Sequence, residues 1–166
     1  MSERRRIFIA CPISKYLRNE GGMDPGFEAF IRDVHQTCRR YGDDVFLALE
    51  REAYGQAVMD DVTCTPLDFE ALRAADVVVA IPEDSMGVAV ELGWASALGK
   101  EIVLVLDPRF RYSPLITALH CITTARTLML PDGGPTPAAA RRVAQFLHPL
   151  LARGAPHPEP EVAAAD

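Results

Sequence analysis

Apolar positions along this chain fall into short uninterrupted runs, and each run is followed by a segment with helical spacing. Short runs rich in β-branched residues are typical of strands that are buried on both faces. We expect strands at residues 6–11, 44–49, 76–81, 101–106 and 127–130. The run 76–81 (DVVVAI) is the clearest of the five.

Between these runs, apolar residues recur every three or four positions, which predicts amphipathic helices. We expect helices from Phe27 to a stop at Gly42, and over 65–75, 87–98, 113–120 and 138–151. In the second of these helices, Thr65 would serve as the cap and Pro66 would occupy the first turn. Gly99 would end the third helix, and Pro149 would kink the end of the last one. Residues 50–64 show no clean period, so a loop or a broken helix is expected there.

The alternation of strands and helices predicts an α/β fold with a flavodoxin-like, doubly wound five-stranded parallel sheet. In such folds the ligand lies beyond the carboxyl ends of the strands, where the strand order reverses. A single domain is expected over residues 1–153. The tail 154–166 contains three prolines and little apolar bulk, so it is expected to be disordered.

Composition narrows the possible functions. The chain has 166 residues, of which 49% are apolar and 24% are charged, so one compact domain with a sizeable core is expected. Its net charge of −6 disfavours a partner such as a nucleic acid polymer, which requires a basic face. A small phosphorylated substrate needs only a local positive pocket.

Neither a membrane nor a metal is indicated as a partner. No apolar run approaches the ~20 residues of a membrane span, and the apolar stretch 7–11 is too short for a signal peptide. The cysteines Cys11, Cys38, Cys64 and Cys121 are scattered without a CxxC pair, which disfavours a zinc or redox site. We therefore expect free thiols in the cytoplasm, with no metal and no cofactor.

The loop after the third strand and the helix that follows it contain the most informative residues. Ser85 is a plausible N-cap, and Gly87 would let an anion approach the free amides of the helix. Glu91 is the only charged residue between Asp84 and Lys100. It is either a partly desolvated carboxylate suited to nucleophilic attack, or a residue on a narrow solvent-facing edge. The sequence supports both interpretations equally.

Further candidates are individually ambiguous. Asp68 could provide the second carboxyl group that an N-glycosidase uses, or it could only complement a helix dipole. Ser14, Lys15 and Arg18 could face a phosphate or be solvated, and Thr117 could be a hydroxyl bonded to its own helix. The chain has no GxGxxG, P-loop, HExxH or Ser-His-Asp arrangement, so dinucleotide, NTPase, zincin and triad chemistry lack support.

The segment from Asp68 to Lys100 resembles the nucleoside 2-deoxyribosyltransferase superfamily, above all in Ser85-Met86-Gly87-Val88-Ala89-Val90-Glu91-Leu92-Gly93. It is similar to the nucleoside 5′-monophosphate N-glycosidase branch, which includes the CMP hydrolases of the mildiomycin and blasticidin pathways. The resemblance extends from about residue 7 to the final helix. It implies the flavodoxin-like fold, an N-glycosidic substrate and, by analogy, a place in nucleoside antibiotic biosynthesis.

The resemblance also implies roles for individual residues. Glu91 matches the nucleophile, and Asp68 matches the carboxyl group that assists the leaving base. Ser85 and Gly87 match contacts to the 5′-phosphate. Thr117 matches a hydroxyl residue from the partner subunit, which implies a homodimer.

Other matches concern the base and the ribose. Glu50-Arg51-Glu52-Ala53-Tyr54-Gly55 resembles a stretch that lies near them, which makes Arg51 and Tyr54 candidate contacts. Phe8 stands where several members carry a tyrosine that orients the nucleophile. Ser14 stands where a CMP hydrolase carries a phosphate-contacting arginine. Ser-Met-Gly replaces an Asp-Gly motif of the transferases, which favours a phosphorylated substrate.

The sequence therefore predicts a hydrolase that cleaves a nucleoside 5′-monophosphate, with CMP as the first guess, into free base and (deoxy)ribose 5-phosphate. Three alternatives remain, one of which is a flavodoxin-like domain without catalysis that serves a protein partner. A second base could resolve the intermediate in place of water, which would make the protein a (deoxy)ribosyltransferase. A nucleotide sensor without turnover would keep the pocket and would still bind after Glu91→Ala.

Overall fold

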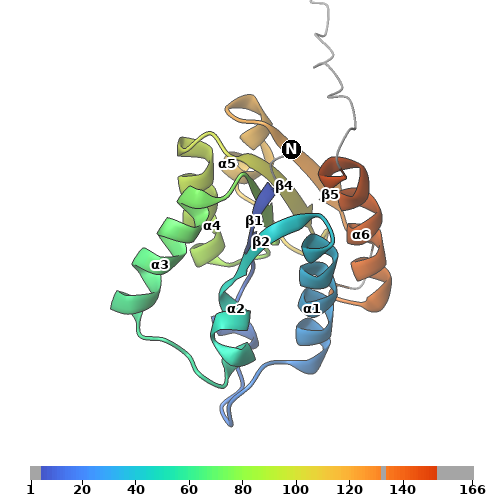
Figure 1. Ribbon diagram of the computed structural model, residues 1–166. Coiled ribbons are helices and arrows are strands. Elements are labelled where there is room, and N and C mark those ends of the chain that lie inside the picture. The colour runs from blue at the N-terminus through green and yellow to red at the C-terminus, as the bar shows by residue number, and fades with distance from the viewer. Residues whose placement is uncertain (1–4, 132–133, 153–166) are drawn as a thin grey trace, which may run out of the picture.

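The computed structural model describes residues 5–131 and 134–152 and contains one five-stranded sheet (Figure 1). The strands are β1 Arg5–Ala10, β2 Gly42–Leu47, β3 Val77–Ala80, β4 Glu101–Leu106 and β5 Ala125–Met129. All pairs are parallel, in the order β2-β1-β3-β4-β5. This is the flavodoxin-like, doubly wound order that the sequence predicts.

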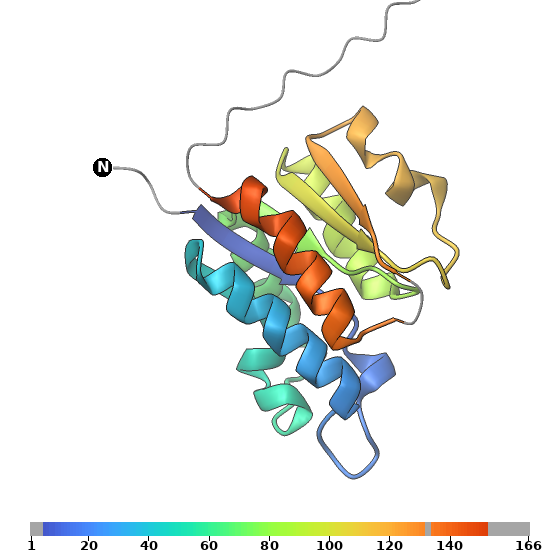
Figure 2. The ribbon, with the colours of Figure 1, turned by 90° about the vertical axis from the view of Figure 1, so that its right-hand side faces the viewer.

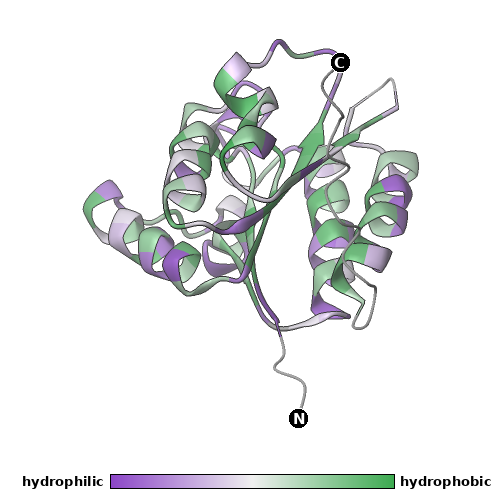
Figure 3. Cartoon of the chain, turned by 90° about the horizontal axis from the view of Figure 1, so that it is seen from above, coloured by the Kyte–Doolittle hydropathy of each residue, from purple (hydrophilic) through white to green (hydrophobic). Residues whose placement is uncertain are grey.

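Helices cover both faces of the sheet. They are α1 Pro25–Arg39, α2 Ala48–Arg51, α3 Asp61–Ala74, α4 Met86–Ala97, α5 Pro114–Thr117 and α6 Pro137–Leu151. Helices α1 and α6 lie side by side over one face (Figure 2), and α3 and α4 pack on the other. Seen from above, apolar strands run between the two helix layers (Figure 3).

The core divides into two clusters, one on each side of the sheet. Strand residues alternate between them: Ile7 and Ile9 face α1 and α6, whereas Phe8 and Ala10 face α3 and α4. All of these side chains are buried. This burial on both faces explains why the strands read as continuous apolar runs.

Several of the expected boundaries are wrong. Helix α1 ends at Arg39, and Gly42, the expected stop, is the first residue of β2. Residues 48 and 49 begin the short helix α2 rather than end a strand, because both are buried apolar residues and an apolar run alone cannot distinguish the two conformations. Helix α3 begins at Asp61, where the carboxylate of Asp60 caps the amide of Thr63 at 3.0 Å. Thr65 is therefore not the cap, and Pro66 lies inside the helix.

At α4 the expectations hold, whereas at α5 they hold only in part. Ser85 caps α4 by accepting a hydrogen bond from the Val88 amide at 3.3 Å, and Gly99 follows α4 with φ +65°. The helix expected over 113–120 is shorter: α5 ends at Thr117 and a 3₁₀ turn covers Leu119–Cys121. The expected disordered tail, 154–166, lies outside the described residues.

Candidate functional site

The topology places a pocket at the carboxyl ends of β1 and β3, where the strand order reverses. Its volume is about 550 Å³. It is bounded by the loop after β1, by Asp68 of α3 and by the first turns of α4. The lining residues are Cys11, Pro12, Ile13, Ser14, Lys15, Asp68, Asp84, Ser85, Met86, Gly87, Val88 and Glu91. The candidates from the sequence that the fold brings together here are Ser14, Lys15, Asp68, Ser85, Gly87 and Glu91.

Glu91 is half-buried in the pocket wall. One side of α4 is buried against the sheet and consists of Val88, Leu92 and Ala95. Glu91 lies next to this buried side. The pKa of Glu91 is raised from 4.5 to about 8, first because burial removes water from the carboxylate and second because Asp68 adds a negative charge nearby. Of the two interpretations of Glu91, the structure supports the desolvated carboxylate.

Asp68 is the second carboxyl group of the pocket, and an arginine holds it. Arg51 Nη1 donates a hydrogen bond to Asp68 Oδ1 at 2.7 Å, and Arg51 Nη2 donates one to Glu52 Oε1 at 3.0 Å. The Arg51 guanidinium also lies 5.5 Å from the centroid of the Phe46 ring. Arg51 therefore reaches the site through Asp68 and does not line the pocket itself.

The start of α4 forms the anion-accepting side of the pocket. The first amides of a helix have no partner within the helix, and the helix dipole places partial positive charge there. In front of Gly87 the space is open: an added Cβ would meet only the Ser85 hydroxyl, at 3.7 Å. A phosphate could therefore approach this backbone closely.

An ionic cluster that the sequence did not predict stands opposite this helix start. Lys15 Nζ donates to Glu83 Oε2 at 3.1 Å and to Asp84 Oδ1 at 2.8 Å. Glu83 is buried and has a φ of +43°, which is unusual for a residue with a side chain. The Tyr16 hydroxyl lies within 3.0 Å of both Glu83 oxygens. Glu83 thus holds the positive charge of Lys15 at the pocket, although the two residues are 68 positions apart in the sequence.

Like Arg51, four other sequence candidates do not line this pocket: Phe8, Arg18, Tyr54 and Thr117. Phe8 is 1% exposed and stacks on Phe46 at 5.2 Å, beneath Arg51. Tyr54 is buried under the Arg32 guanidinium, 3.4 Å from the ring centroid. Thr117 is exposed on α5, where its hydroxyl donates to the Pro114 carbonyl at 3.4 Å.

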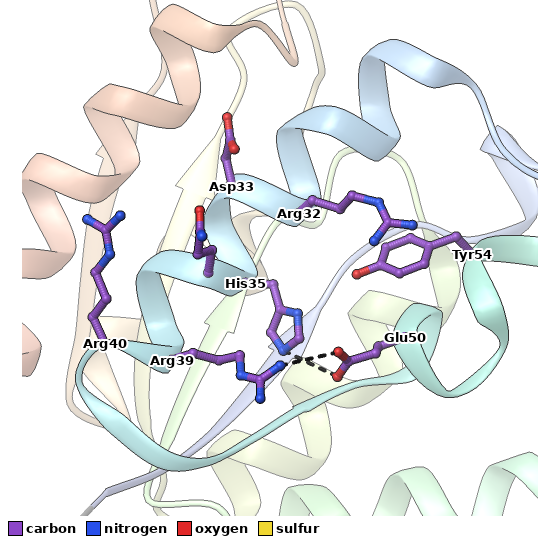
Figure 4. A pocket seen from close by; sticks show the side chains of 8 residues that line it. Arg32, Asp33, His35, Arg39, Arg40, Glu50 and Tyr54 are labelled. Carbon is purple, nitrogen blue, oxygen red and sulfur yellow. Dashed lines mark hydrogen bonds and ion pairs between the residues drawn. The ribbon is translucent and has the colours of Figure 1, made fainter.

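Tyr54 instead lines a second pocket of about 570 Å³ (Figure 4). Glu50 of α2 lies there between two side chains of α1: 3.5 Å from His35 Nε2 and 3.5 Å from Arg39 Nη1. Burial lowers the pKa of His35, although the Glu50 carboxylate opposes this effect. This pocket lacks the half-buried carboxyl pair of the first.

Metal and membrane chemistry find no support in the described part of the chain. Residues 5–131 and 134–152 contain no group of three or more His, Cys, Asp or Glu side chains arranged to hold a metal ion. Within the same residues, every helix is too short or too polar to cross a membrane.

Solved structures with the same fold include three close matches in length. A CMP N-glycosidase, BcmB, from Clostridium botulinum shares 24% identity over 89% of this chain and 100% of its own, with a TM-score of 0.63. The solution structure of BlsM shares 29% identity over 89% of this chain and 94% of its own, with a TM-score of 0.66. A conserved protein from Enterococcus faecalis V583 shares 19% identity over 87% and 99%, with a TM-score of 0.57.

Among curated protein sequences, no relative matches this chain. A family model described as nucleoside 2-deoxyribosyltransferase matches residues 21–134. The matched region includes β2 to β5 and both carboxyl groups of the pocket, Asp68 and Glu91. This protein therefore belongs to the nucleoside 2-deoxyribosyltransferase family.

Proposed function

We propose that this protein hydrolyses the N-glycosidic bond of a nucleoside 5′-monophosphate. The observation that carries the proposal is the position of Glu91, whose half-buried carboxyl group lines a pocket together with a helix N-terminus. A carboxylate that can attack C1′ and an anion site that can hold the phosphate are thereby placed around one space.

The reactive form of the carboxyl pair holds one proton, on Asp68, so in the first step an ionised Glu91 oxygen attacks C1′ of the sugar. The bond between C1′ and the base nitrogen breaks, and the base leaves with the bonding electrons and with a proton from Asp68. Arg51 keeps the Asp68 carboxyl group in position by its 2.7 Å hydrogen bond. The product of this step is a glycosyl ester on Glu91.

In the second step, water attacks C1′ and the Glu91 carboxylate leaves. Asp68 accepts the proton of the attacking water, which restores the starting enzyme. The products are free base and (deoxy)ribose 5-phosphate, with net retention at C1′. The Ser85 hydroxyl and the open backbone at Gly87, both in the pocket lining at the start of α4, would bind the phosphate.

CMP is the proposed substrate because the sequence resembles the CMP hydrolases of this family. A CMP N-glycosidase that is 24% identical shares the fold. The polar groups near Arg51 would lie toward the base and the ribose. Phe8 supports this region indirectly, because it stacks under Phe46, which in turn underlies Arg51.

We also propose that the active unit is a homodimer. Helix α4 and the neighbouring α5 expose large apolar side chains: Met86 is 85% exposed, Val90 51% and Leu115 82%. A second copy would cover these side chains. It would also bring Thr117, which is exposed two residues from Leu115, toward the phosphate of its partner's substrate.

The test is a panel of ribo- and deoxyribonucleoside 5′-monophosphates and their unphosphorylated nucleosides, with released base detected by chromatography. Base release from one monophosphate but not from its nucleoside, lost in Glu91→Ala, is the expected result. Formation of a new nucleotide when a second base is added would indicate the transferase instead. Nucleotide binding without any release would indicate a sensor and would overturn the proposal.

A further inference from the structure

Lys15 is the only positively charged side chain among the described residues that line the pocket. Asp68, Asp84 and Glu91 are acidic members of the same lining. An anion that approaches the start of α4 therefore meets one ammonium group, and that group already contacts the carboxylates of Glu83 and Asp84. A phosphate can therefore bind the Lys15 ammonium only alongside these carboxylates or in place of one of them.

The two carboxylates differ in how firmly they are held. The Glu83 side chain is 3% exposed, and the Tyr16 hydroxyl contacts both of its oxygens. The Asp84 side chain is 61% exposed, and Lys15 is its only hydrogen-bonding partner among the described side chains. Rotation of Asp84 into water therefore breaks one contact, whereas movement of Glu83 breaks a buried network.

Lys15 itself is held from a third direction. Its ammonium lies 4.1 Å from the centroid of the Phe110 ring, a cation–π contact that does not involve Asp84. With Glu83 and Phe110 in place, Lys15 would keep its position after Asp84 had moved away.

We propose that Lys15 recognises the phosphate of the substrate and that Asp84 is a built-in competitor, whose carboxylate occupies the phosphate's place beside Lys15 in the free protein. The inference rests on the proposed function for the identity of the phosphate-bearing substrate. It adds a reason for selectivity: a dianionic phosphate displaces the carboxylate, whereas the 5′-hydroxyl of a nucleoside cannot. Asp84 thus costs affinity but excludes unphosphorylated ligands.

The test measures binding of ribose 5-phosphate to the full chain by calorimetry, without any turnover. Asp84→Asn is expected to tighten binding about threefold, the size typical of one exposed ion pair. Lys15→Met is expected to weaken binding about tenfold, whereas Lys15→Arg, which keeps the charge, retains most of it. Asp44→Asn is the matched control, since Asp44 is exposed on β2 at the opposite end of the sheet.

The double variant separates competition from simple repulsion. If Asp84 acts by occupying Lys15, Asp84→Asn will gain little or nothing in the Lys15→Met background. An equal gain in both backgrounds, or a gain no larger than that of Asp44→Asn, would overturn the proposal. So would undetectable binding by both the wild type and Asp84→Asn.

This outcome is distinct from failure of the proposed function. Suppose that no nucleotide releases its base but the Lys15 and Asp84 substitutions still change ribose 5-phosphate binding as expected. The hydrolase proposal would then be wrong, and the competition between Asp84 and phosphate for Lys15 would stand. If base release is intact but these substitutions do not change binding, only the proposed competition between Asp84 and phosphate would be wrong.

Discussion

At the scale of the residue, the chemistry depends on how two carboxyl groups in one pocket are kept different. Burial in the pocket wall desolvates the Glu91 carboxyl group, whereas the Asp68 carboxylate accepts a hydrogen bond from Arg51. Sites that separate the properties of paired carboxyl groups in this way commonly divide nucleophilic and proton-transfer roles between them. Two predictions follow from the environment of Glu91.

The first concerns the pH dependence of the reaction. The reactive form needs one proton on the Glu91–Asp68 pair, and that proton is lost as the pH passes the pKa of about 8, so kcat/KM is expected to be level below about 8 and to fall above it. Asp68→Asn removes the proton donor, so the slower reaction that remains should lose this fall and require only that Glu91 is ionised. A wild-type profile that is already flat from pH 6 to 9 would contradict the assigned role.

The second concerns stability. Since the pKa of Glu91 is raised from 4.5 to about 8 in the folded protein, unfolding releases its proton between these values and stability falls as the pH rises. Glu91→Gln mimics the protonated form. It should stabilise the protein by on the order of 2 kcal/mol at pH 9 and should have no effect near pH 4.5. The value at pH 9 is set below the full free energy of the pKa shift because water in the pocket screens the charge. Thermal unfolding at both pH values checks this, and an equal effect at both would refute it.

At the scale of the element, the short helix α2 connects two parts of the molecule. Glu50 contacts His35 and Arg39 of α1 (Figure 4). The next residue, Arg51, holds Asp68 of α3. The position of Asp68 in the pocket therefore depends on contacts that α2 makes on its other side.

His35 should make this element sensitive to acid. Burial lowers its pKa in the folded protein, so the unfolded chain binds a proton more readily and stability is lost as the pH falls below about 6.5. Glu50 opposes this loss, whereas Arg32 and Arg39 add to it. His35→Gln should flatten the decline of Tm between pH 7.5 and 5, with His120→Gln at an exposed histidine as the control. An unchanged slope in His35→Gln would show that another group governs the decline.

Most elements were predictable because the signals are local. The apolar runs of β1, β3 and β4, the Ser85 cap and the Gly99 stop require no knowledge of distant residues. The start of α3 was mispredicted because Thr65-Pro66 resembles a helix start, whereas Asp60 provides a better cap earlier in the chain. Ala48 and Leu49 were mispredicted because burial alone does not fix their conformation.

The site was predictable only where a single residue carried the signal. Glu91 stood out as the one charge in an apolar helix, and the structure places it in the pocket. The Arg51–Asp68 and Lys15–Glu83 pairs could not be found in this way, because each joins separate elements through tertiary packing. Buried Glu83 gave no signal, since its neighbours Pro82 and Asp84 read as an ordinary loop.

At the scale of the whole molecule, the doubly wound order decides where chemistry can occur. The chain crosses from β2 at one edge back over β1 to β3, so the loops after β1 and β3 diverge and leave the pocket between them. Met86, one of the exposed apolar residues of the proposed dimer face, also lines this pocket, which links the proposed dimer to the site.

The dimer is tested by a charge placed on this face. Leu115→Asp is expected to yield a monomer in light scattering after size exclusion, and to reduce base release because Thr117 of the partner no longer reaches the phosphate. Met129→Asp, which changes an exposed apolar residue on edge strand β5, is the matched control and should remain dimeric. A wild-type protein that is monomeric and fully active would contradict the proposed assembly.

Cytosine release from CMP and from cytidine, by the wild type and by Glu91→Gln, tests most directly whether Glu91 cleaves a nucleoside 5′-monophosphate. The wild type should release cytosine from CMP and not from cytidine. Glu91→Gln preserves shape and binding but removes the nucleophile, so its kcat should fall about 10³-fold or more while CMP still binds. Retention of kcat within tenfold in Glu91→Gln would show that Glu91 is not the nucleophile.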